Sequence, residues 1–343
     1  MMKTDNRTYN ALRISCAFGA GSNKASGFCE AIQNGGFIDS DFEDLLKSGI
    51  FDGDSLARLN SVKPATVDGI LRTCEDYKIR VITIFDGDYP NRLKNIPSPP
   101  VVLYVLGNLP DVDSDPLFCV VGPRRISGFG RKAAFSLSRR LSKAGMTVVS
   151  GTAAGADTAA HLGALDANAG SVMVAADGIV SQLKSSNHEL VKRILERGAV
   201  ISENPPEKPA GKYSFPIRNR LMSGISIGVA VVEAPKISGA LITAGHAADI
   251  FSRYVFDFPE KIDVQKAFGE GDKKKKKALR KKSTEGLSNE ALLVYNNLVK
   301  QEFTVDDLSA LSLDGAVLLS ALTELEMERF ISSLPGGLYR KID

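Results

Sequence analysis

From residue 117 onward, short apolar runs alternate with longer stretches in which apolar residues recur at helical spacing. The runs are rich in valine and too short for helices, as buried parallel strands are. Two intervening stretches, Gly130–Lys143 and Asp157–Ala167, are amphipathic, and Gly145 stands where a glycine commonly ends a helix. This alternation predicts a mostly parallel sheet covered by helices. The predicted strands are Leu117–Val121, Met146–Ser150, Ser171–Ala175, Ala199–Ser202, Gly228–Glu233 and Tyr254–Phe258.

The residues upstream of this region predict two further parts. Ile79–Phe85 and Val101–Leu106 flank a proline-rich turn and are expected to extend the sheet. Residues 8–77 show short helical patterns interrupted by glycine and aspartate. The predicted fold is therefore α/β, an extended Rossmann-like, doubly wound and mostly parallel sheet preceded by a small helical domain.

The end of the chain differs in composition from the sheet. Residues 264–286 form a lysine-rich segment bounded by glycine, in which like charges repel and extend the chain. Residues 287–343 predict three helices and a hairpin at Pro335-Gly336-Gly337, the outline of a winged-helix-like domain. The predicted domains are a helical domain at 1–77, the Rossmann-like domain at 78–263, a basic linker at 264–286 and the winged-helix-like domain at 287–343.

Length and composition fit a folded, water-soluble chain. The 343 residues are 43% hydrophobic and 24% charged, enough for two or three domains with buried cores. No run approaches the roughly 18 apolar residues of a membrane span, and the first residues lack the apolar core of a secretory signal. We therefore expect a cytoplasmic location and no membrane partner.

The four cysteines and the charge distribution narrow the function further. The cysteines lie far apart without a CxxC pair, so reduced structural thiols are expected rather than zinc or disulfides. The net charge of +3 conceals a net +6 in residues 264–286 and a net −5 in residues 287–343. A DNA-binding role would therefore need a local basic patch, and the acidic tail is not expected to be the main DNA contact.

The first predicted strand runs into the glycine-rich turn VGPRRISGFG. Gly122, Gly128 and Gly130 place backbone N–H groups and a helix N-terminus where they can hold a phosphate. The spacing is not GxGxxG, so these glycines can equally serve close packing of helix on sheet. Arg124 and Arg125 favour the phosphate site, because guanidinium groups make bidentate contacts to phosphate. Ser127 completes the candidate residues of this turn.

The second strand ends in a similar turn, SGTAAGADTAAH. Gly151 and Gly155 lie at its mouth, and successive parallel strands bring both turns to one edge of the sheet, where open α/β folds bind ligands. Asp157 can be a helix N-cap instead of a functional carboxylate. His161 lacks a nucleophile to activate, which favours a packed helix histidine.

The segment KYSFPIRNRLMSG combines cations with an aromatic residue in a loop expected to lead into a helix. Single-stranded nucleic acids bind in cationic grooves where bases stack on aromatic rings. The alternative places the Phe215 ring in the core and the arginines on a solvated helix face. The candidate binding residues here are Lys212, Phe215, Arg218, Asn219 and Arg220.

A third turn follows the strand ending at Glu233, with Ser238 and Gly239 at the start of the next helix. The sequence contains no GxxxxGK[ST] loop, no HExxH and no pair of carboxylates placed for metal-assisted hydrolysis. Phosphate-binding turns without a nucleophile or metal cluster favour holding a polyanion over cleaving it. We therefore expect no catalytic residues, no metal and no cofactor.

Several of these segments, in this order and context, resemble the DNA-processing protein A family (DprA, also called Smf). The resemblance is strong over about residues 78–258. It rests on ITIFDGDYPNRLKNIPSPPVVLYVLGNL, VVGPRRISGFG, VVSGTAAGADTAAH, FPIRNRLMSG and VVEAPKISGALITA.

The resemblance implies an extended Rossmann fold that forms a homodimer, binds single-stranded DNA without sequence preference and loads the RecA recombinase during natural transformation. It implies DNA contacts from Arg124, Lys212, Arg218 and Arg220, with Phe215 as the stacking aromatic. Gly151, Gly155, Ser238 and Gly239 would line the phosphate pocket. The helical N-terminal domain would correspond to a SAM-like module and the tail to an accessory winged helix.

The sequence departs from the family pattern at three places. Pro123 replaces the usual serine and removes a backbone N–H from the first turn. Ala240 stands where serine or threonine is usual, and the glycine- and asparagine-containing segment expected after Pro259 is replaced by the lysine-rich linker. Residues 8–77 match poorly.

Two other classes of function remain open from the sequence. One is an enzyme like the phosphoribohydrolases, whose PGGxGTxxE element is absent, since Pro335-Gly336-Gly337 lacks the Gly-Thr and Glu that should follow. The other is a nucleotide sensor without catalysis, because the same turns could hold one mononucleotide. A sensor would leave the basic linker unexplained.

Overall fold

The computed structural model describes residues 5–233, 243, 245–246, 287–298, 302–304, 306–311, 313, 315–327, 330–334 and 338–341. The chain divides into two compact units, Met1–Gly271 and Asp272–Asp343, and each is considered by itself. The predicted strand Tyr254–Phe258 and the linker 264–286 lie outside the described residues.

Residues 5–76 form helices joined by short turns, in agreement with the helical pattern predicted from the sequence. Four of the five helices begin at a side chain that accepts a backbone N–H bond of the first turn, the usual N-cap, at Asp5, Ser22, Asp41 and Asp52. The fifth begins at Pro64, a residue suited to the first helical position. The helices are α1 (Asn6–Phe18), α2 (Asn23–Asn34), α3 (Phe42–Lys47), α4 (Gly53–Ser61) and α5 (Pro64–Asp76).

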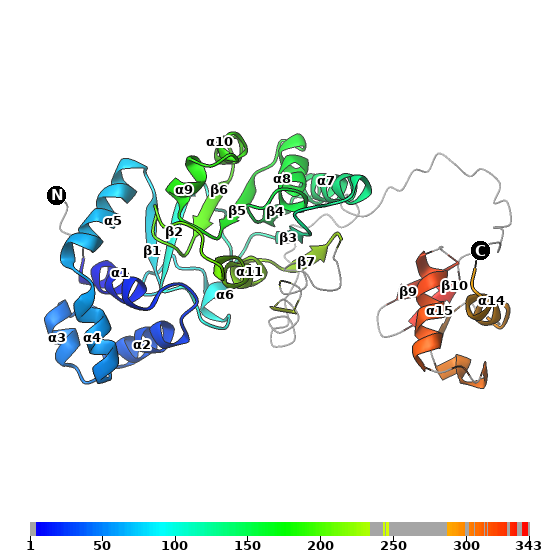
Figure 1. The fold of residues 1–343 in the computed structure, drawn as a ribbon, viewed down its shortest axis with the longest axis horizontal. Coiled ribbons are helices and arrows are strands. Elements are labelled where there is room, and N and C mark those ends of the chain that lie inside the picture. Colours follow the sequence, from blue (N-terminus) through cyan, green and yellow to red (C-terminus); the bar gives the residue numbers. More distant parts are fainter. Residues whose placement is uncertain are drawn as a thin grey trace. The chain divides into compact units, whose positions relative to one another are not determined.

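A seven-stranded sheet forms the centre of the first unit, with the strand order β1-β2-β6-β5-β4-β3-β7 (Figure 1). The pairs among β3 to β7 are parallel, whereas β2 is antiparallel to β6 and β1 is antiparallel to β2. The sheet is thus extended upstream as predicted, but by an antiparallel hairpin. The strands are β1 (Arg80–Thr83), β2 (Val102–Gly107), β3 (Leu117–Val121), β4 (Thr147–Ser150), β5 (Ser171–Ala175), β6 (Ala199–Ser202) and β7 (Gly228–Val231).

Both faces of the parallel strands are buried, which explains their nearly continuous apolar sequences. Successive residues point to opposite faces, so Val148 packs in one core cluster and Val149 in another. The cluster of Val149 includes Leu221 and Leu93 from α11 and α6, and the cluster of Val148 includes residues of α7 and α8. The helices of this region are α6 (Asn91–Lys94), α7 (Gly128–Lys143), α8 (Ala156–Asp166), α9 (Ile179–Leu183), α10 (His188–Leu195) and α11 (Ser214–Ile225).

Gly145 has φ of 89° after α7, as expected for a glycine that ends a helix. Strands β3, β5 and β6 have the predicted boundaries, and the other described strands differ from prediction by one or two residues at an end. The mostly parallel, doubly wound α/β fold is therefore confirmed.

The second unit holds a three-stranded antiparallel sheet with the order β8-β10-β9. The strands β9 and β10 flank Pro335-Gly336-Gly337, which lies outside the described residues. The middle helix is a 3₁₀ helix, η1, rather than an α-helix. The winged-helix assignment stays a prediction. The described elements are α14 (Asn289–Asn296), β8 (Glu302–Thr304), η1 (Asp306–Leu311), α15 (Gly315–Met327), β9 (Ile331–Leu334) and β10 (Leu338–Lys341).

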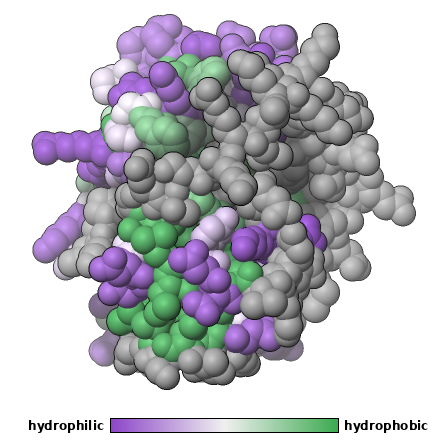
Figure 2. All heavy atoms as spheres, turned by 90° about the vertical axis from the view of Figure 1, so that its right-hand side faces the viewer, coloured by the Kyte–Doolittle hydropathy of each residue, from purple (hydrophilic) through white to green (hydrophobic). Residues whose placement is uncertain are grey.

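The surface carries hydrophilic side chains with apolar ones visible between them, as Figure 2 shows for one face. Two of the exposed large apolar residues lie within segments singled out from the sequence: Phe129, at 83% exposure, in VGPRRISGFG and Tyr213, at 67% exposure, in KYSFPIRNRLMSG. Among the described residues, no helix is long and apolar enough to cross a membrane.

Candidate functional site

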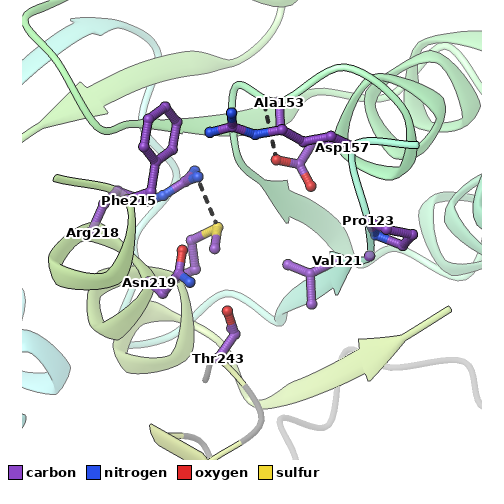
Figure 3. A pocket seen from close by; sticks show the side chains of 11 residues that line it. Val121, Pro123, Ala153, Asp157, Phe215, Arg218, Asn219 and Thr243 are labelled. Atoms are coloured by element: carbon purple, nitrogen blue, oxygen red, sulfur yellow. Dashed lines mark hydrogen bonds between the residues drawn. The ribbon is translucent and has the colours of Figure 1, made fainter. Parts of the chain in front are cut away.

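A cavity of about 350 Å³ opens at the carboxyl ends of β3 and β4. The helix α11 forms one wall, opposite Val121 and Pro123 of the first turn, and Ala153 and Asp157 of the second turn lie between them (Figure 3). Parallel strands end together at this edge, where open α/β sheets bind ligands. The lining residues are Val121, Gly122, Pro123, Arg124, Ala153, Asp157, Phe215, Arg218, Asn219, Met222 and Thr243.

The two glycine-rich turns pack directly on each other. The carbonyl of Pro123 accepts the N–H of Ala156 at 3.3 Å. Gly155 has φ of +93°, and a Cβ there would collide with the carbonyls of Pro123 and Arg124. A Cβ on Gly122 would lie 2.7 Å from the Cβ of Ala156. These glycines therefore serve close packing, and that packing in turn positions Arg124 at the mouth of the cavity.

Arg124 and Phe215 meet at this mouth. The guanidinium carbon of Arg124 lies 4.3 Å from the centre of the Phe215 ring, within the range of a cation–π contact. Arg124 is exposed and Phe215 is half-buried. The Phe215 ring is thus not in the core, contrary to the structural alternative. The segment around Phe215 is also not a loop, because α11 already begins at Ser214.

The floor of the cavity contains a buried carboxylate and a buried guanidinium. The Asp157 carboxylate accepts the backbone N–H of Ala153 at 3.1 Å, and Arg218 donates to the carbonyl of Val174 at 2.6 Å. A Cβ on Gly151 would meet both charged groups, so glycine leaves the space that they occupy. Burial raises the pKa of Asp157, while the positive charge of Arg218 opposes this rise; burial likewise lowers the pKa of Arg218.

Asp157 is not the helix N-cap considered from the sequence. The cap position of α8 is Gly155, and Asp157 lies inside the first turn with its side chain directed at the preceding loop. The carboxylate stabilises the turn from within, and it contributes negative charge to the cavity floor.

His161 is the packed helix histidine that the sequence favours. It is fully buried, with Nε2 at 3.0 Å from the carbonyl of Gly151 and Nδ1 at 2.8 Å from Oγ of Ser171. Burial lowers the pKa of His161 to about 4, and Arg218 lowers this pKa as well. The carbonyl of Gly151 only accepts, so the neutral ring carries its proton on Nε2, while the hydroxyl of Ser171 donates to the carbonyl of Val148 at 2.8 Å.

The two arginines of α11 have different surroundings. Arg220 is buried and pairs with Glu203 at 2.5 Å, and the other oxygen of Glu203 accepts the N–H of Gly21 at 2.9 Å. Arg220 therefore ties α11 to β6 and to the helical N-terminal region, and it does not line the cavity. Arg218 and Asn219 do line it. The alternative that places the arginines on a solvated helix face does not hold for this structure.

The remaining residues predicted from the sequence lie around the cavity rather than in it. Ser127 caps α7 by accepting the N–H of Gly130, and its hydroxyl donates to Glu233 at 2.9 Å. Arg125 and Lys212 are exposed on the turns that border the site. Ser238 and Gly239 lie outside the described residues.

Met222 in the cavity wall was not among the residues predicted from the sequence. Residues 215, 218, 219 and 222 follow the i, i+3, i+4, i+7 spacing of one helix face, so a helix assigned from residue 214 would have predicted a single stripe facing the cavity. Glu203 was not predicted either, because its pairing with Arg220 joins two separate segments and leaves no local signal in the sequence.

The side chains at the cavity mouth are suited to a ligand that carries both an anionic group and a flat ring. Arg124 makes no hydrogen bond or ion pair with a described residue, so its N–H groups are available to a phosphate. The ring beneath it offers a face for stacking. No group of three or more His, Cys, Asp or Glu side chains placed to hold a metal ion occurs among the described residues.

Comparison with known proteins identifies the family. The model of the family described as DNA recombination-mediator protein A matches residues 80–291. Protein Smf of Synechocystis sp. is 41% identical over 191 residues, which cover 55% of this chain and 48% of that protein. The DNA processing protein DprA of Bacillus subtilis is 33% identical over 190 residues, covering 55% and 64%. The matched part thus spans about half to two thirds of these relatives.

A solved structure agrees with this match. The X-ray structure of DNA processing protein A (DprA) from Streptococcus pneumoniae superposes with a TM-score of 0.62 at 28% identity, over 72% of this chain and 85% of that one. The matched family model includes the sheet and both glycine-rich turns. We conclude that this chain belongs to the DNA recombination-mediator protein A family.

Proposed function

We propose that this protein acts in DNA processing and recombination by binding single-stranded DNA, without sequence preference, in the cavity at the carboxyl ends of β3 and β4. The observation that carries the proposal is the exposed Arg124 guanidinium over the Phe215 ring at the cavity mouth, 4.3 Å from its centre. Cations contact the backbone of any sequence, and every base has a face that can stack.

The surroundings of the cavity support a polymer ligand rather than a reaction. Arg125 and Lys212 are exposed beside the mouth and extend the positive charge beyond the cavity itself. The carboxylate of Asp157 is fully buried and engaged with Ala153, so it is a poor candidate for a general base. We therefore propose a binding protein that is not an enzyme and needs no cofactor.

The resemblance to the family extends the proposal to partners. We propose that the chain works as a homodimer in the cytoplasm and delivers the bound strand to RecA. A strand held by stacking and phosphate contacts at one edge of the sheet leaves its remaining length free for a recombinase.

One titration tests the central claim. Fluorescent oligo-dT and a matched duplex are titrated against the protein at low and high salt. We expect tighter binding of the single strand and a steep loss of affinity with salt, because phosphate contacts release counterions. Equal affinity for duplex would overturn the proposal. Lys212→Ala should weaken binding, whereas Lys208→Ala removes a nearby exposed charge and serves as the matched control.

A nucleotide sensor is the second candidate, since a cavity of about 350 Å³ is of the size of a small-ligand pocket. It predicts that dTMP binds as tightly as oligo-dT. The strand-binding proposal predicts that dTMP competes only at far higher concentration.

A further inference from the structure

A second and larger hollow lies on the other side of the β4–α8 turn. Its volume is about 620 Å³, and it runs between α7 and α8. Ala153 of this turn lines the first cavity, whereas Ala154 and Gly155 line the second hollow. One turn of the chain therefore separates the two. We refer to this hollow as the α7–α8 groove; its lining residues are Arg131, Lys132, Phe135, Ser136, Ala154, Gly155, Thr158, Ala159, Leu162 and Asn187.

The shape of the groove follows from a close helix crossing. A Cβ on Gly163 would collide with the backbone carbonyl of Phe135, so the two helices touch at this point. The groove extends from this crossing toward the amino-terminal ends of α7 and α8. Asn187 closes its far side and donates from Nδ2 to the carbonyl of Thr152 at 2.8 Å, which fixes that wall to the same turn.

The charges of the groove are of one sign. Its lining includes Arg131 and Lys132 and contains no aspartate or glutamate. Both cations are exposed, and within the part of the chain that the structure describes neither side chain has an ion pair or hydrogen-bond partner. Unpaired cations above an apolar floor of Phe135, Ala159 and Leu162 suit a ligand with phosphates and flat rings.

Aromatic side chains accompany these cations along α7. Phe129, Lys132 and Phe135 follow one another at three-residue intervals and so lie along one side of the helix. Phe129 is 83% exposed. A large ring left in water beside a cation is available for stacking with an exposed base.

We infer that the α7–α8 groove is a second subsite for the same single strand, which crosses the β4–α8 turn and places further nucleotides against α7. Arg131 and Lys132 contact the phosphates there, and Phe129 and Phe135 offer faces for bases. This inference rests on the proposed binding of single-stranded DNA in the first cavity, and it adds Arg131, Lys132 and Phe135, which lie outside the sequence motifs.

Tryptophan reporters can test each subsite separately, because the sequence contains no tryptophan. Phe215→Trp reports on the first cavity, Ser136→Trp on the groove and Arg140→Trp on the far end of α7. Each variant is titrated with oligo-dT of about 4 and about 16 nucleotides, the range of sizes typical for one single-strand site. We expect both lengths to quench Phe215→Trp, only the longer one to quench Ser136→Trp, and neither to quench Arg140→Trp.

The outcomes separate the two proposals. Quenching of Phe215→Trp without any response of Ser136→Trp to the longer strand would overturn the groove subsite and leave the proposed function standing. Absence of oligo-dT binding to the unsubstituted protein would overturn both. Quenching of Ser136→Trp by dTMP alone would show a separate nucleotide site and would also overturn the inference.

A second experiment removes the charges of the groove and therefore needs no bulky tryptophan inside it. Arg131→Ala with Lys132→Ala should lower the salt slope for the longer strand by about 1.4, or about 0.7 for each of two phosphate contacts, and leave the slope for the shorter strand unchanged. Arg140→Ala with Lys143→Ala removes the same charge from the same helix outside the groove and should change neither slope. Equal effects of both pairs would contradict the inference.

Discussion

Two pairs of arginines surround the cavity, and they are held in opposite ways. Arg124 and Arg125 lie exposed in the turn after β3, with no hydrogen bond or ion pair to a described residue. Arg218 and Arg220 are each only 5% exposed in α11, where they contact Val174 and Glu203. Burying a guanidinium costs free energy unless it is paired, and each buried arginine has such a partner, whereas the exposed arginines are directly accessible to a ligand. Residue type alone therefore does not identify a binding arginine.

We therefore expect the buried arginines to stabilise the fold and the exposed arginines to contribute affinity for DNA. This expectation differs for Arg220 from what the family resemblance implies, because the resemblance makes both arginines of α11 contacts to DNA.

Arg220→Met should cost about 3–5 kcal/mol of unfolding free energy, because it leaves the Glu203 carboxylate buried without its partner. Chemical denaturation measures this loss. Binding of oligo-dT by the folded variant in the cold should be unchanged. The double variant Arg220→Met with Glu203→Gln should recover most of the stability. If binding is lost while stability is kept, Arg220 contacts DNA directly and the comparison fails for this residue.

His161 is a buried titratable group beneath the cavity, so it makes the stability of this region depend on pH. Its folded pKa of about 4 lies below the usual 6.5, so as pH falls from 6.5 to 4 the unfolded ring takes up a proton that the folded ring does not. Unfolding free energy should fall over this window by up to about 3 kcal/mol from this group. Denaturation at a series of pH values measures the slope.

Asp157 acts in the opposite direction, because burial raises its pKa in the folded protein. The free energy of unfolding contributed by this group therefore increases as pH falls toward the pKa of Asp157 in the unfolded chain. The variant His161→Gln keeps Asp157 and removes only the histidine contribution. The unfolding free energy of this variant should no longer fall as pH decreases from 6.5 to 4. An unchanged dependence would mean that other groups produce it.

Phe215→Ala should weaken binding of oligo-dT by about 1–3 kcal/mol, the range for one stacking aromatic. Stability should change much less than the roughly 3–5 kcal/mol expected for a core phenylalanine, because the ring is only half-buried. A melt and a binding isotherm on the same variant distinguish these cases. Phe215→Tyr should bind almost normally. A strongly destabilised Phe215→Ala that still binds DNA would remove the ring from the site.

Arg124→Ala should have the smallest effect, a weakening that is the same for all sequences and a salt slope lower by about 0.7, as for one phosphate contact of a single strand. Stability should not change, because the guanidinium is exposed. Arg125→Ala in the same turn measures the contribution of an exposed cation outside the cavity lining. An unchanged salt slope for Arg124→Ala would contradict its place in the DNA site.

The order of strands and helices could be predicted from the sequence because local patterns determine it. Valine-rich runs such as Leu117–Val121 and Ser171–Ala175 are buried on both faces, and this burial appears directly as a short apolar segment. The glycine-rich turns could likewise be placed at one sheet edge, since consecutive parallel strands end there. Arg124, Gly151 and Gly155 could therefore be brought together on local grounds, whereas Phe215 joined them only through the resemblance to the family.

Only the tertiary structure decided which cations are free. The pairing of Arg220 with Glu203, and of Glu203 with the backbone of Gly21, joins three segments that are separate in sequence. The spacing of residues within α11 cannot reveal this pairing, because the sequence pattern of a charged helix residue is the same whether its side chain contacts water or a buried carboxylate. The same limit hid the α7–α8 groove, whose cations and rings lie on two helices that only the contact at Gly163 brings together. Burial depends on long-range packing, and packing decides which of several identical side chains can bind a ligand.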